Sequence, residues 1–188
     1  MPVLLSAILL LINVIFNTYI FILLLRILFQ KCHIDFYNPL YQWVLRMTNP
    51  PLNPLRRYMP HYAGFDSSAL IFLFLLQCVK FILICLIESG LWPHSLGLII
   101  TAFADSVGQF LNLLFYALLF MVVISWVNPL NPLSGLINRI TDPLLKSMKR
   151  YIPLIGGMDF TPMIAILGLK LIEMVLVTPL LNFGKVLM

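Results

Sequence analysis

Four long apolar runs dominate the pattern of hydrophobic and polar positions along the chain. The first run contains no charged side chain, and the other three contain one or two each: Lys80, Asp105, and Lys170 with Glu173. Each run has about the 20 residues that a helix needs to cross the hydrocarbon core of a bilayer. The pattern therefore predicts four transmembrane helices, at residues 3–25, 67–87, 103–126 and 162–181.

The segments that join these runs in pairs share one pattern. The first reads TNPPLNPLRRYMPHYAGFDSSA at residues 48–69, and the second reads TDPLLKSMKRYIPLIGGMDFTP at residues 141–162. So many identities in one gap-free register are not expected by chance. We predict a tandem duplication of one unit (span, basic loop, span), with residues 1–90 and 91–188 as the two copies. The identical pairs, 93 residues apart, include Asn38 and Asn131, Pro39 and Pro132, Thr48 and Thr141, Pro50 and Pro143, Arg57 and Arg150, Pro60 and Pro153, Gly64 and Gly157, and Asp66 and Asp159.

Composition agrees with this class of protein. Hydrophobic residues make up 61% of the chain and charged residues 10%, and the mean hydropathy is +1.00. A soluble domain of 188 residues needs far more polar surface to cover its core. We therefore predict an all-α membrane protein with four transmembrane helices, in contact with the lipid bilayer.

The net charge of +5 is a signal of topology before it is a signal of a nucleic-acid partner. Nine of the twelve Lys and Arg residues lie in the loops at residues 26–66 and 127–160. The positive-inside rule places both loops in the cytoplasm and both termini outside. Each unit has two spans, so the second copy inserts in the same orientation as the first. The repeat is therefore parallel, related by an approximate two-fold axis along the membrane normal. Direct nucleic-acid binding is not predicted.

The loops carry signals for short helices. Asn131 and Pro132 form a good N-cap and first turn, and Asp142 and Pro143 repeat the signal. The second helix, residues 144–152, places apolar and basic side chains on different faces, as in a helix that lies among lipid headgroups. Such an element can be a rigid connection that positions two spans. Alternatively, it can be a surface for anionic lipid or for a protein partner.

Asp66 and Asp159 each come just before a span. A carboxylate there can cap free backbone N–H groups and complement the helix dipole, which is the role we predict. Arg57 and Arg150, nine residues earlier in each copy, can add an ion pair with these carboxylates.

Lys80 and Glu173 occupy the same position in the two copies, 93 residues apart. A bare charge inside the bilayer costs several kcal/mol and normally finds a partner or faces the interior of the bundle. If the second and fourth spans pack on the two-fold axis, the two residues form an ion pair, and Lys170 shares the carboxylate. The alternative is that both side chains snorkel toward the outer headgroups.

The doubled signature resembles the YggT/YlmG family of small integral membrane proteins, which also occurs in plastids. It reads NPLYQWVLRMTNPPLNPLRRYMPHYAGFDSS in the first copy and NPLSGLINRITDPLLKSMKRYIPLIGGMDFTP in the second. The second copy is the fuller match, whereas the first has Asn49, Ala63 and Ala69 in place of Asp142, Gly156 and Pro162. The resemblance implies a multi-pass protein of the bacterial inner membrane. It also implies a role in organising membrane processes such as division, nucleoid organisation, cytochrome maturation, or osmotic and ion homeostasis. The family-motif positions in the second copy are Thr141, Asp142, Pro143, Arg150, Pro153, Gly156, Gly157, Asp159 and Pro162.

No motif in the sequence indicates catalysis. There is no G-x-S-x-G elbow, no H-E-x-x-H and no glycine loop for phosphate. The histidines His33, His61 and His94 are dispersed, and no C-x-x-C joins the three cysteines, so no metal, haem or other cofactor is predicted. We expect a scaffold or assembly factor that binds other membrane proteins and is not an enzyme. The alternative is a component of ion homeostasis or osmotic stress tolerance, which requires a homo-oligomer because four spans are too few for a complete pore.

Overall fold

The computed structural model describes residues 2–58, 66–128, 132–149 and 160–188, and it contains no strand in these ranges. Eight helical elements lie in these ranges, four before residue 128 and four after it. Their bounds are α1 Pro2–Lys31, α2 Pro39–Tyr58, α3 Ser67–Ser89, α4 Ser95–Val127, α5 Pro132–Lys149, α6 Thr161–Ile172, the π-helical turn η1 Glu173–Val177, and α7 Thr178–Leu187.

Four helices are long and apolar enough to cross a membrane, which confirms the prediction. They are Val3–Lys31, Ser67–Ser89, Ser95–Val127 and Thr161–Leu187, the last of which joins α6, η1 and α7. The third is the longest, with 33 residues. At 1.5 Å per residue it spans about 50 Å, more than the roughly 30 Å of the hydrocarbon core. Hydropathy marks where a helix crosses the core, but the helix continues until a residue stops it.

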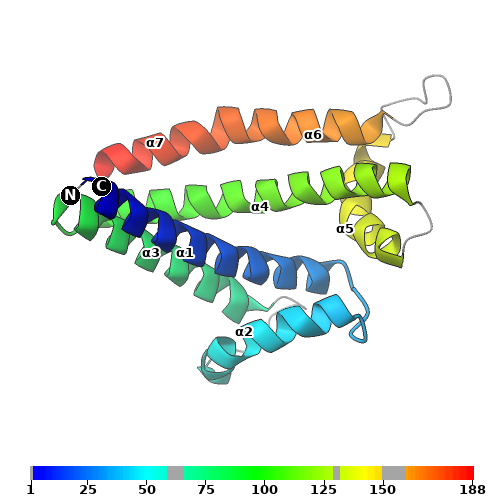
Figure 1. Cartoon of the computed structure of the whole chain (residues 1–188), viewed down its shortest axis with the longest axis horizontal. Helices are drawn as coiled ribbons and strands as arrows, with labels where there is room; N and C mark the ends of the chain where they lie inside the picture. Colours follow the sequence, from blue (N-terminus) through cyan, green and yellow to red (C-terminus); the bar gives the residue numbers. More distant parts are fainter. Residues whose placement is uncertain (1, 59–65, 129–131, 150–159) are drawn as a thin grey trace.

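The two ends of the bundle differ (Figure 1). Both chain ends and the connection between α3 and α4 lie at one end, and α2 and α5 lie toward the other. The first end is tied together because the backbone N–H of His94 donates to the carbonyl of Met188 at 3.3 Å. At the opposite end, α2 and α5 cross the direction of the spans.

The short helices of the basic segments differ from the prediction. We predicted a helix that starts at Asp142 and Pro143, but α5 is one helix from Pro132 to Lys149 with Pro143 inside it. Likewise α2 runs through Pro50, Pro51 and Pro54. An internal proline removes one backbone hydrogen bond. In both helices a threonine two residues before an internal proline donates its hydroxyl to the carbonyl four residues back, a bond that often accompanies a bend in a helix.

The buried core has two parts. One lies mainly between α1, α2 and α3, with Leu52 of α2 fully buried in it, and it also includes Leu113 of α4 and Ile140 of α5. The other lies between α4, α5 and α6, with Leu145 of α5 buried. The helix α2 therefore packs under α1 and α3, whereas α5 contributes to both parts of the core. This packing fixes α2 and α5 relative to the membrane helices and brings their polar residues to defined places.

The spans α4 and α7 approach each other closely at two glycines. A Cβ atom added to Gly97 would lie 2.6 Å from the backbone N of Met188, and one added to Gly184 would lie 2.9 Å from the backbone N of Thr101. Small residues let membrane helices pack closely without a hydrophobic driving force. The contact holds α7, with Lys185, beside the first turns of α4.

Candidate functional site

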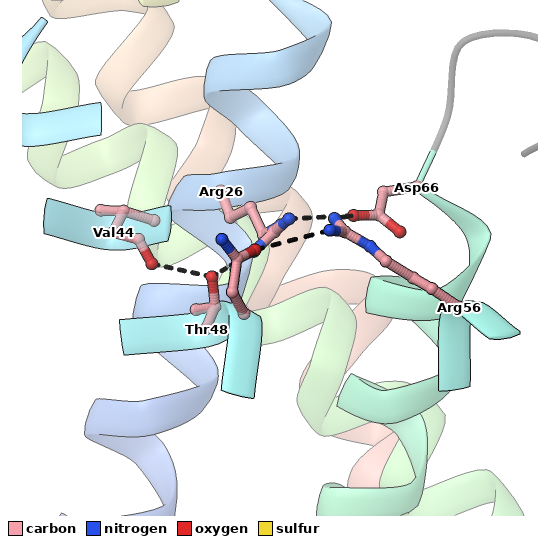
Figure 2. Close-up of polar contacts among 6 residues, drawn as sticks. Arg26, Val44, Thr48, Arg56 and Asp66 are labelled. Atoms are coloured by element: carbon pink, nitrogen blue, oxygen red, sulfur yellow. Dashed lines mark hydrogen bonds and ion pairs between the residues drawn. The ribbon is translucent and has the colours of Figure 1, made fainter. Parts of the chain in front are cut away.

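A cluster of charged and polar side chains joins α1, α2 and the start of α3. We call it the Asp66 cluster: Arg26, Thr48, Asn49, Arg56 and Asp66. Arg26 Nη2 lies 3.3 Å from Asp66 Oδ2, and Arg56 Nη2 donates to the same oxygen (Figure 2). Arg26 Nη1 donates to Thr48 Oγ1, and to Asn49 Oδ1 at 2.9 Å. Three separate helices are therefore joined at one carboxylate.

The Asp66 cluster is buried and positively charged. The side chains of Arg26 and Asp66 are only 3% and 1% exposed, and that of Arg56 is 27% exposed. Two guanidinium groups face one carboxylate, so the cluster has an excess of one positive charge. Arg26 Nε, Arg56 Nε and Asp66 Oδ1 have no hydrogen-bond partner among the described residues. Buried charges like these are tolerated only while they stay paired.

The structure corrects the role predicted for Asp66. Its carboxylate makes no side-chain cap bond to α3, and only its backbone carbonyl accepts from the first turn, from Ala69 N at 2.9 Å. The predicted ion-pair partner is also wrong, because Arg56 pairs with Asp66 whereas Arg57 is exposed. One residue along a helix is a rotation of about 100°, so only one of the two neighbours can face α1 and α3. Asp159 and Arg150 lie outside the described residues.

The second copy lacks the buried arginine of the Asp66 cluster. Thr141 is buried and bonded to the carbonyl four residues back, like Thr48, but its hydroxyl lies 3.2 Å from Met121 Sδ where that of Thr48 accepts from Arg26. The position that matches Arg26 is Leu119, so the second copy has no arginine there. This asymmetry is visible in the sequence. We took Arg26 for the first basic residue of a loop, whereas it lies within α1 and is buried.

The other motif residues described in the structure have local roles. Asn38 Oδ1 accepts from the backbone N of Leu40 at 2.9 Å, so Asn38 and Pro39 begin α2 as a capped helix. Asp142 lies 3.9 Å from Lys146 in a surface ion pair, and Pro162 is in the first turn of α6. The motif residues outside the described ranges are Pro60, Gly64, Asn131, Arg150, Pro153, Gly156, Gly157 and Asp159.

A second cluster lies within the spans around Lys80, whose side chain is 2% exposed. This Lys80 cluster consists of Asn17, Lys80, Asp105 and Gln109. Lys80 Nζ donates to Asn17 Oδ1 at 3.0 Å and forms an ion pair with Asp105. Gln109 Nε2 donates to the same two oxygens, each at 3.0 Å. Residues from α1, α3 and α4 therefore surround one buried ammonium group.

A third cluster, the Glu173 cluster, joins α4 to the last span through Asn112, Lys170 and Glu173. Lys170 Nζ donates to Glu173 Oε2 and to Asn112 Oδ1, both at 2.7 Å. Asn112 Nδ2 donates to Glu173 Oε1 at 2.8 Å. The π-helical turn begins at Glu173. Such turns are frequent at functional sites because they rotate side chains out of the regular helical register.

The predicted ion pair between Lys80 and Glu173 is wrong. Lys80 pairs with Asp105, and Glu173 pairs with Lys170 on its own span. The reason is that α3 and α6 both pack on α4. Polar residues of α4 therefore pair with Lys80 and with Glu173. Snorkelling is not the outcome for Lys80 either, because its side chain is buried. Asp105, Gln109 and Asn112 follow one another at i, i+4 and i+7 and share one face of α4. This spacing in the sequence could have indicated that α4 supplies the partners of Lys80 and Glu173.

The three cysteines are dispersed and unpaired by disulfides. Cys32, Cys78 and Cys85 are free thiols. Burial raises the pKa of the Cys32 thiol, so this side chain stays protonated and weakly nucleophilic at neutral pH. Within the described ranges, no three His, Cys, Asp or Glu residues are grouped where they could hold a metal ion.

Comparison with known proteins identifies relatives over nearly the whole chain. The sequence pattern described as CCB3/YggT matches residues 5–87 and 100–180. An uncharacterized protein of Pseudomonas aeruginosa is 38% identical over 167 residues, which cover 87% of this chain and 85% of that protein. The uncharacterized protein YggT of Escherichia coli K12 is 34% identical over 182 residues, which cover 95% of this chain and 93% of that protein. No solved structure gives a significant match.

Proposed function

The chain belongs to the CCB3/YggT family, and we propose that it is a non-enzymatic scaffold or assembly factor that organises other membrane proteins. One observation carries the proposal. The Asp66 cluster fixes α2 to α1 and α3, while the opposite face of α2 is apolar and exposed. Leu40, Trp43 and Met47 lie on that face at 42%, 47% and 48% exposure. A rigid helix with an aromatic and aliphatic face is suited to binding the helix of another membrane protein.

The placement of α2 and α5 supports a position among lipid headgroups. Val44, Thr48 and Leu52 point into the protein, and Arg46 and Arg57 are exposed. Exposed arginines next to an apolar face favour anionic lipid at this surface. We propose that α2 and α5 are the interfacial amphipathic helices of two parallel repeat units.

The distribution of basic residues supports an orientation in the bacterial inner membrane with α2 and α5 in the cytoplasm. In a variant whose three native cysteines are changed to serine, a membrane-impermeant thiol reagent added to intact cells should react with a cysteine introduced at Ser95 and leave one at Lys149 unmodified. The reverse pattern of labelling would show that the protein has the opposite orientation.

Photo-crosslinking tests whether the exposed face of α2 binds another membrane protein. A photoreactive amino acid at Trp43 or at Met47 is expected to give a small set of discrete protein adducts in native membranes. The matched control is Val79, which is similarly exposed, at 45%, but lies in the middle of the span α3. There we expect lipid adducts only. Equal adduct patterns from all three positions would contradict a binding face on α2.

A second candidate function rests on the Lys80 and Glu173 clusters. Charged groups inside a membrane commonly mark pathways for ions or protons. An oligomer of this chain could therefore serve ion homeostasis or osmotic stress tolerance. Purified wild-type protein would then change ion flux across liposomes, and Asp105→Asn would abolish the change; the scaffold predicts no flux in either case.

A further inference from the structure

A cavity of about 550 Å³ lies beside the Lys80 cluster. Its wall is formed by α1, α3, α4, α7 and the connection at residues 90–94, which is the end of the bundle that carries the chain termini. Polar residues line much of it: Asn13, Asn17, Lys80, Glu88, Asp105 and Lys185. Its volume is in the range of small-molecule sites, and its lining combines apolar side chains, such as Phe81 and Trp92, with these polar groups.

The inner part of the cavity offers hydrogen-bond acceptors. Asp105 Oδ2 is engaged by Lys80 and Gln109, but its Oδ1 has no donor among the described residues. Asn13 Nδ2 donates to the carbonyl of Leu9 at 2.9 Å, which leaves its Oδ1 as an acceptor. Lys80 is already bonded to Asn17 and Asp105. A group that donates several hydrogen bonds fits this place.

The outer part offers one charge of each sign. Glu88 and Lys185 both line the cavity and are exposed, and within the described residues they form no ion pair. Lys185 is held near α4 by the close contact of Gly184 with Thr101. Lys80 and Asp105 neutralise each other, and so do the charges of Glu88 and Lys185, so the net charge of the lining side chains is zero. A neutral but strongly dipolar lining favours a dipolar ligand, because a single charge would leave one end of the site unmatched.

We propose that this cavity binds a small zwitterionic solute of amino-acid size. Its ammonium group donates to Asp105 Oδ1 and Asn13 Oδ1, and its carboxylate faces Lys185. The site is independent of the binding face on α2, which lies at the other end of the bundle.

The native Cys85 provides the test, because it lines the cavity. In a Cys32→Ser, Cys78→Ser background it is the only thiol, and an impermeant thiosulfonate reagent reports its access to water. We expect glycine or β-alanine to slow the modification of Cys85 at least threefold at saturation. Methylammonium and acetate at the same ionic strength should have little effect. A thiol at Ser95, in a background with all three native cysteines changed to serine, serves as the control because Ser95 is exposed at the start of α4 and does not line the cavity.

Two variants relate the protection to the proposed contacts. Lys185→Gln, at the exposed rim, should raise at least fivefold the concentration of zwitterion that gives half-maximal protection, with each rate compared with that of the same variant without solute. Lys80→Met with Asp105→Leu removes the inner pair without leaving a lone charge, and it should abolish protection. A Cys85 that resists the reagent in the folded protein, equal protection by all four solutes, or protection by methylammonium alone would each overturn the proposal.

Discussion

Asp66→Leu is expected to lower the stability of the folded protein by about 3–5 kcal/mol, because it leaves two buried guanidinium groups without a counter-charge. Arg26 is the critical partner, since its side chain is almost fully buried and cannot reach water by a change of rotamer. Asp66→Asn keeps the shape but not the charge, and should cost nearly as much. Thermal or denaturant unfolding in detergent, followed by size-exclusion chromatography, measures the loss.

The neighbour Arg57 provides the matched control, because it carries the same charge on the exposed side of α2. Arg57→Gln should stay within about 0.5 kcal/mol of the wild type, as surface substitutions do. Combining Asp66→Asn with Arg56→Gln removes one charge of each sign and should recover part of the stability. Asp66→Asn that unfolds like the wild type would show that the carboxylate is not what holds the three helices.

The second large effect is expected at Asp105. Asp105→Leu leaves the ammonium group of Lys80 inside the spans with only neutral partners, and we expect a loss of about 3–5 kcal/mol or a failure to accumulate in the membrane. The double variant Lys80→Met, Asp105→Leu removes both charges. It should be close to the wild type in stability, because replacing a buried ion pair with apolar residues is often neutral.

A double-mutant cycle separates this pairing from the one predicted by the repeat. Lys80→Met and Glu173→Gln should be additive within about 0.5 kcal/mol, since the two residues share no partner. Lys80→Met and Asp105→Leu should instead show a large coupling. Strong coupling between Lys80 and Glu173 would contradict the pairing of Lys80 with Asp105 as the interaction that stabilises the protein.

The four spans could be predicted because length and hydropathy depend on the sequence alone. The ion-pair partners could not, because they depend on how each helix is rotated about its axis. Lys80 and Glu173 are equivalent by register, yet both α3 and the last span face α4. The choice of Arg56 over Arg57 is a similar case, since the sequence places both in one turn and only packing decides which one is buried.

The short helices of the basic segments show a different limit. Asp142 and Pro143 are a good signal for a helix start, and we placed a boundary there. The structure continues the helix because the burial of Ile140 and Leu145 on its apolar face offsets the loss of one backbone hydrogen bond. Local start signals are overridden where tertiary packing supports a longer helix.

The location of Asp105 has a consequence for biosynthesis. Lys80 leaves the ribosome 25 residues before its counter-charge, and in the finished protein that counter-charge belongs to the next span. A second span inserted alone would place an uncompensated lysine in hydrocarbon, at a cost of about 2.5–3.5 kcal/mol on translocon scales. We therefore expect α3 and α4 to enter the bilayer together as a hairpin. A chain truncated at Gly90 should then insert its second span less completely than one truncated after Val127, as glycosylation mapping would measure. The ion pair thus sets an order of membrane insertion as well as a geometry.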